Sequence, residues 1–77
     1  MYIEIITPDR NIFSGEIESG IFPGSDGFFG VQENHAPMVA TLKEGKIKLY
    51  TSNQEETFEV KGGVLEISHN KVIVLAD

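Results

Sequence analysis

The fold class is decided by the stretch Val64–Leu75, which reads VLEISHNKVIVL. Two runs of aliphatic and β-branched residues flank the dipeptide His69-Asn70. Asparagine tolerates the positive φ that a primed two-residue turn requires, so the stretch predicts a β-hairpin. After Lys71 the second run is apolar on both faces, which predicts a strand in the middle of the structure.

More short apolar runs precede this hairpin, separated by turn signals. They are rich in β-branched residues or alternate between apolar and polar side chains, as strands do. The alternation places Ile17 and Ile21 opposite the neighbouring glutamates and turns Ile47 and Leu49 inward. The predicted strands cover Tyr2–Thr7, Asn11–Ser14, Glu16–Phe22, Lys46–Thr51 and Thr57–Val60, while Met38–Leu42 fits either a strand or a helical turn.

The longest stretch without a clear period runs from Pro23 to Pro37 and contains three glycines and two prolines. We interpret it as an irregular connection. The adjacent rings of Phe28 and Phe29 either plug one end of the fold or stand exposed as an anchor for a partner. No segment has the period of an amphipathic helix. The pattern therefore predicts an all-β fold of eight or more strands, an antiparallel β-sandwich or flattened barrel, as one domain over residues 1–77.

Composition excludes several classes of protein. The chain has 77 residues, with 12 Asp and Glu against 6 Lys and Arg, and no cysteine. A disulfide framework and a zinc ribbon are excluded, and the net charge of −6 argues against a nucleic-acid partner. We expect a soluble product, because no apolar run approaches the roughly 20 residues of a membrane span and no basic segment begins a signal peptide. Surface scaling gives about 4,700 Å² of exposed surface and a thin margin of stability.

Residues with catalytic potential are present but are not arranged in a known catalytic motif. His35 and His69 fall in separate predicted loops, and neither belongs to a metal-binding spacing. No serine occupies a nucleophile-elbow motif. The paired carboxylates, at Glu16 and Glu18 and at residues 55–59, are typical of a solvated face. The glycines of residues 24–30 lack the following helix and the cation of a phosphate loop. We expect no catalytic, cofactor or metal site.

Six segments together resemble one known family. They are Ile5–Arg10, Phe13–Gly15, residues 23–37 with Pro-Gly-Ser-Asp-Gly and Asn-His-Ala-Pro, Leu42–Gly45, Gly62–Ile67 and Val72–Asp77. In this order and spacing they resemble the N-terminal domain of the epsilon subunit of the F-type ATP synthase. The resemblance implies a ten-stranded β-sandwich. It also implies a non-catalytic rotor subunit of the central stalk, which couples proton flow to ATP synthesis at the cytoplasmic face of the bacterial inner membrane.

The resemblance further implies two partners, the gamma subunit and the polar loops of the c-ring, with no insertion into the membrane. By position, the residues that would face the c-ring are Gly24, Ser25, Asp26, Gly27 and Phe28. Those that would meet gamma or the ring are Thr7, His35, Pro37, Met38 and Ala40. Relatives that continue into a C-terminal helical hairpin use it to bind ATP or to restrain hydrolysis. The printed sequence stops before such a hairpin, so we expect neither property.

Two other classes of function remain open at this point. The first is a free-standing β-sandwich that binds a small ligand or peptide through the loop carrying Phe28 and Phe29. The second is a hydrolase, which would need His35 or a carboxylate pair in a cleft.

Overall fold

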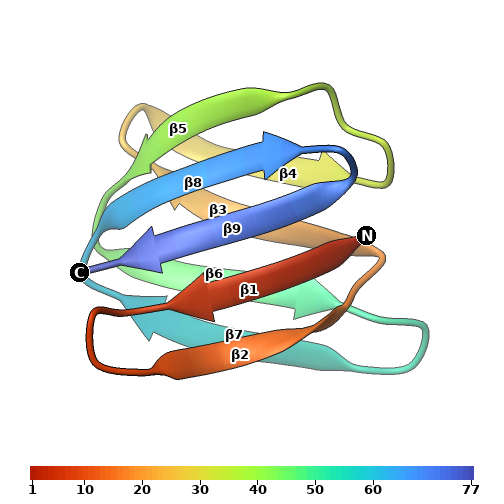
Figure 1. The fold of residues 1–77 in the computed structure, drawn as a ribbon, viewed down its shortest axis with the longest axis horizontal. Helices are drawn as coiled ribbons and strands as arrows, with labels where there is room; N and C mark the ends of the chain where they lie inside the picture. Colours follow the sequence, from red (N-terminus) through yellow and green to blue (C-terminus); the bar gives the residue numbers. More distant parts are fainter.

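The chain folds into two β-sheets that face each other across an apolar core (Figure 1); the computed structural model describes residues 1–77. The front sheet has the strand order β2-β1-β9-β8-β5, and the back sheet has the order β4-β3-β6-β7. Their bounds are β1 Tyr2–Ile6, β2 Asn11–Glu16, β3 Ser19–Gly24, β4 Gly27–Gln32, β5 Met38–Leu42, β6 Gly45–Tyr50, β7 Glu55–Val60, β8 Gly63–Ser68 and β9 Lys71–Ala76. The all-β sandwich is thus confirmed. No helix has the length and apolar character of a membrane span.

The core forms because each strand turns every second side chain inward. Ile47 and Leu49 of β6 are buried, as the alternation predicted. The hairpin between β8 and β9 is also confirmed, since its turn residues His69 and Asn70 have φ values of 53° and 58°. The other fully buried large side chains include Ile3, Ile5, Phe22, Val31, Leu65, Ile67, Val72 and Val74. The exposed surface is 4653 Å², close to the value expected for this mass.

Three sequence-based expectations about strands were wrong. The structure has nine strands rather than ten, and β1 pairs with β9 in parallel, so the sandwich is not wholly antiparallel. The stretch from Pro23 to Pro37 is not an irregular connection, because its first half completes β3 and forms β4. The apolar–polar alternation of β4 was not visible in the sequence, because two phenylalanines are adjacent and the exposed position 30 is a glycine instead of a polar residue.

The predicted strand over Glu16–Phe22 is broken in the middle. β2 ends at Glu16, and the Glu18 amide then donates to the carbonyl of Tyr50, which carries the chain from the front sheet to the back sheet. The alternation consequently restarts at β3. Ile17 is buried as expected, but Ile21 points outward with 37% of its surface exposed, and Phe22 takes the inward place.

The two sheets are joined on one side only. At one corner Gly24 of β3 pairs with Leu42 of β5, and this contact continues the hydrogen-bonded path from one sheet into the other. On the opposite side β2 and β7 have no backbone pairing. There the rings of Phe13 and Phe58 close the core, with centroids 5.1 Å apart. The ambiguous segment Met38–Leu42 is the strand β5 that forms this corner.

Candidate interaction surfaces

The tight hairpin between β3 and β4 carries the residues expected at the c-ring. Gly24 pairs with Gly27, so the turn consists of Ser25 and Asp26, both exposed. Gly27 has a φ of 131°, a backbone conformation that favours glycine. Phe28 follows at the start of β4 and is 65% exposed. The hairpin therefore presents a hydroxyl, a carboxylate and an aromatic ring on a rigid support.

The structure separates the roles of the two adjacent phenylalanines. Phe29 pairs with Phe22 across the hairpin, and their rings stack with centroids 5.8 Å apart inside the sandwich. Phe28 points the other way, to the outer face of the back sheet, because successive side chains of a strand alternate between faces. Phe29 thus packs against the core, and Phe28 is available to a partner.

The hairpin tip is fixed to the front sheet by polar contacts with β5. The Ser25 amide donates to the Thr41 carbonyl at 2.9 Å, and the Thr41 hydroxyl donates to the Ser25 hydroxyl at 2.8 Å. A groove of about 350 Å³ lies between the hairpin and β5, with Phe29 and Ala40 among its lining residues. Ala40 therefore belongs with the hairpin residues in space.

An apolar row crosses the outer face of the front sheet, at positions that the sequence pattern did not single out as a surface. Ile6 pairs with Leu75 and Leu75 with Val64, so these three side chains, which we call the front row, lie side by side. Leu75 is 52% exposed and Val64 39%. The front row borders a cavity of about 460 Å³ that Thr7 also lines. The sequence signal for this row was the apolar residues at the outward positions of β9. They predicted that β9 is a central strand, which is correct, but no other element covers the outer face of β9.

The remaining predicted residues lie at the other end of the sandwich, in or beside the loop between β4 and β5. Pro37 is exposed, and the half-buried His35 has its Nδ1 atom 2.7 Å from the carbonyl oxygen of Ala36. Met38 packs partly against the core, whereas its neighbour Val39 is 69% exposed. The structure thus brings Thr7, Ala40 and the hairpin to one end and leaves the loop residues at the other.

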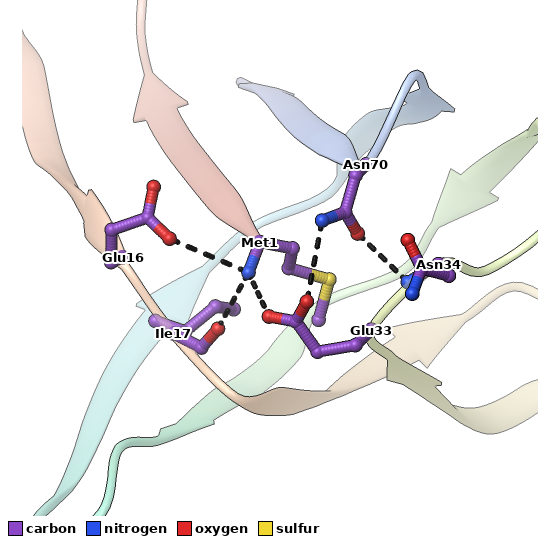
Figure 2. A network of polar contacts seen from close by, with 6 residues as sticks. All are labelled: Met1, Glu16, Ile17, Glu33, Asn34 and Asn70. Atoms are coloured by element: carbon purple, nitrogen blue, oxygen red, sulfur yellow. Dashed lines mark hydrogen bonds and ion pairs between the residues drawn. The ribbon is translucent and has the colours of Figure 1, made fainter.

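A polar network holds that second end together (Figure 2). The Met1 α-ammonium group is buried, donates to the Ile17 carbonyl at 3.0 Å and is bonded to the Glu33 carboxylate. The Asn70 side chain donates to Glu33 at 3.3 Å and accepts from the Asn34 amide at 2.8 Å. The network therefore connects the first residue, the β4–β5 loop and the β8–β9 turn.

Both charged partners of the network have shifted pKa values. The hydrogen bond from the Met1 ammonium lowers the pKa of Glu33 below its ordinary value of 4.5, and the Asn70 amide contributes further. The same bond with Glu33 raises the pKa of the Met1 amine above 8.0, although burial opposes this shift. Each group thus favours the charged form of the other.

We expect the stability of the chain to be greatest between about pH 4.5 and 8. Glu33 has a lowered folded pKa, so its contribution is present above 4.5 and is lost as the pH falls through the folded value. The Met1 amine has a raised pKa, so its contribution is present below 8.0 and is lost as the pH rises through the folded value. Glu33→Gln should lower the melting temperature at pH 6 by a few degrees and flatten its pH profile.

The matched control is Glu16→Gln, which removes the more exposed carboxylate 3.5 Å from the Met1 amine. It should change the profile less than Glu33→Gln. Identical melting profiles for both variants and the parent chain would show that the network contributes nothing to stability.

Comparisons with known proteins match the entire chain to one family. The family model described as "ATP synthase, Delta/Epsilon chain, beta-sandwich domain" matches residues 1–77. The ATP synthase epsilon chain of Chlorobium limicola is 45% identical over 76 residues, which cover 97% of this chain and 86% of that protein. The epsilon chain of Chlorobaculum tepidum is 47% identical with the same coverage. The chain covers only 59% of the epsilon chain of Leptospira interrogans, at 40% identity.

Solved structures share the fold. A chain of the Euglena gracilis mitochondrial ATP synthase superposes with a TM-score of 0.89 at 17% identity, covering 96% of this chain and 48% of that one. A chain from the central stalk and c-ring structure of the Tetrahymena thermophila mitochondrial ATP synthase gives a TM-score of 0.80 at 16% identity, covering 97% and 61%. At these identities the superpositions concern the fold alone.

Proposed function

Because the chain belongs to the ATP synthase delta/epsilon family, through that family's β-sandwich domain, we propose that it is a non-catalytic rotor subunit of the central stalk. In this role it docks on the gamma subunit and on the c-ring, so that the three turn together and proton flow is coupled to ATP synthesis. It acts by binding its partner subunits and catalyses no reaction itself. Its place is at the membrane periphery, on the cytoplasmic face.

One observation carries this proposal: the match to the family runs through residues 1–77, and epsilon chains are its relatives at 45–47% identity. The structure adds surfaces suited to docking. The exposed large apolar side chains include Phe28 on the back sheet and Val39, Val64 and Leu75 on the front sheet. Of these, Val64 and Leu75 are neighbours, and contiguous exposed apolar patches are typical of interaction sites.

We assign the two partners to different surfaces. The β3–β4 hairpin, with Gly24, Ser25, Asp26, Gly27 and Phe28, is narrow and has its tight turn at one end of the sandwich, which suits contact with short polar ring loops. The front row is an apolar, partly exposed strip on a sheet face, which suits contact with gamma. Thr7 borders this row, and Ala40 lines the groove beside the hairpin.

The loop end provides a second contact region for gamma or the ring, with His35, Pro37 and Met38. The network around Met1 and Glu33 holds this loop in place. A preformed loop loses little conformational freedom on binding, so its contacts add to affinity.

Co-purification tests the proposal. The tagged chain should retain the gamma subunit of its own source through size-exclusion chromatography and should join the rotor when gamma and the c-ring are both present. A chain that is folded by circular dichroism but fails to retain gamma would exclude the rotor function and favour a free-standing binding module.

Phe28→Asp should weaken assembly with the rotor by roughly 1–3 kcal/mol and leave the fold unchanged, because the ring is 65% exposed and makes no core contact. Affinity for the c-ring complex and the melting temperature of the free variant are the two measurements. Asn53→Asp adds the same charge in the exposed β6–β7 turn and should change neither. Equal affinity of both variants would exclude Phe28 as a contact.

A further inference from the structure

The outer face of the back sheet contains an apolar groove that the proposed ring contact does not account for. It has a volume of about 510 Å³ and is lined by Ile21, Phe28, Gly45, Lys46 and Lys48, a set that we call the back groove. Ile21 is 37% exposed and Phe28 65%. The residue that pairs with Ile21 on β4 is Gly30, which has no side chain to cover it. The space between the two apolar side chains is therefore open to solvent.

The charged residues that line this groove are two lysines, on a protein that is acidic overall. Lys48 stands in register between Ile21 of β3 and Thr57 of β7, so no carboxylate lies directly opposite it, although Glu55 and Glu59 flank Thr57 on the same face. Lys46 faces Glu59, yet neither lysine forms an ion pair within 4.0 Å; the ion pairs of the structure involve only Met1 and Lys71 as cations. Two of the six Lys and Arg residues are thus unpaired next to exposed apolar surface.

We infer that the back groove binds an acidic amphipathic polypeptide segment, with an apolar side chain between Ile21 and Phe28 and carboxylates on Lys46 and Lys48. Apolar and cationic groups side by side are complementary to a segment that is apolar on one edge and anionic on the other. A concave site also suits an inserted side chain better than a flat surface does. The inference is linked to the proposed function only because Phe28 is a contact residue in both.

An anionic membrane surface fits these observations less well. The chain has a net charge of −6, and Glu55 and Glu59 stand on β7 at the margin of the same face. Two lysines gain about 1 kcal/mol each near an anionic leaflet, whereas the remaining net negative charge opposes approach. A short polypeptide carries fewer negative charges than a lipid surface and places them at the lysines, so the net charge of the chain opposes its approach less.

The test uses the 77-residue chain and two synthetic peptides. The first carries phenylalanine and leucine on one face and glutamate on the other; the second has glutamine in place of each glutamate. Amide NMR titration should place the largest shifts of the glutamate peptide on β3, β4 and β6, and affinity should fall with added salt. The glutamine peptide should bind about tenfold more weakly.

Lys48→Glu should lower the affinity for the glutamate peptide about tenfold, while Arg10→Glu, an equal charge change in the exposed β1–β2 turn, should leave it unchanged. Ile21→Ser gives a second variant that keeps every charge and should also weaken binding. Equal loss in the Lys48 and Arg10 variants, or shifts centred on Val64 and Leu75, would overturn the inference. Flotation with phosphatidylserine vesicles without binding of the peptide would overturn it in favour of a membrane.

Failure of this inference can be distinguished from failure of the proposed function. If the parent chain assembles with gamma and the c-ring but binds neither peptide, only the back groove is refuted. If it binds the glutamate peptide through Lys48 but does not retain gamma, the rotor function is refuted and the groove remains.

Discussion

Gly63→Ala should destabilise the chain by more than about 3 kcal/mol, because this position combines backbone strain with a direct overlap of atoms. Gly63 has a φ of 143°, which L side chains rarely adopt. A methyl group there would stand 2.2 Å from the carbonyl oxygen of Leu75 and 3.0 Å from the Cα atom of Ala76. Both of these atoms belong to the backbone of β9, so no side-chain rotation can relieve the overlap. Gly63 is paired with Leu42 on β5 as well as with Ala76 on β9, so its backbone is held on both sides. Urea denaturation followed by circular dichroism measures the loss.

Gly27→Ala is the matched control for this experiment. Gly27 also has a positive φ, 131°, but an added methyl group would meet no atom within 4 Å. This variant should lose roughly 1–2 kcal/mol, the cost of the strained backbone alone. If Gly63→Ala lost no more than Gly27→Ala, the overlap with Leu75 would have been relieved by a small shift of β9.

Phe22→Ala should lose about 3–5 kcal/mol, the usual cost of removing a buried aromatic ring. Phe22 is fully buried between the two sheets and stacks on Phe29. A chain of this length has roughly 4–12 kcal/mol of stability in total. The variant should therefore melt roughly 15–30 °C lower than the parent chain, measured by calorimetry.

Phe28→Ala removes the same ring from the neighbouring strand of the same hairpin and should change the melting temperature by only a few degrees, since its ring is 65% exposed. Comparable losses in the two variants would contradict the assignment of Phe22 and Phe29 to the core and of Phe28 to the surface.

Local features of the fold were predictable because short-range chemistry determines them. The alternation around Ile47 and Leu49 fixed which face of β6 is buried, and the asparagine of the His69-Asn70 turn fixed a hairpin. Features that depend on distant partners were not predictable. The break after Glu16 exists because Glu18 bonds to Tyr50, and the parallel pairing of β1 with β9 joins the two ends of the chain.

In the candidate interaction surfaces, too, local features were predictable from the sequence and features that depend on distant partners were not. Resemblance predicted contacts at the hairpin and at the β4–β5 loop, and these stay predictions; it could not show that the two segments lie at opposite ends of the sandwich. Nor could it separate Phe28 from Phe29, because that depends on which of them pairs with Phe22. The front row was missed because each of its members comes from a different strand, and only the register brings Ile6, Leu75 and Val64 together.

The corner at Gly24 and Leu42 gives the sandwich an uneven stiffness. Along that corner the layers are linked by backbone hydrogen bonds, which resist changes of length and angle. Along the opposite side no backbone pairing joins β2 to β7, and the packing of Phe13 against Phe58 constrains the layers less than a hydrogen-bonded ladder would. A twisting load applied at the hairpin, which is expected if the proposed rotor function is correct, thus reaches the front sheet through this stiff corner. The elastic deformation is then concentrated at the β2 and β7 margins, far from the surface that receives the torque.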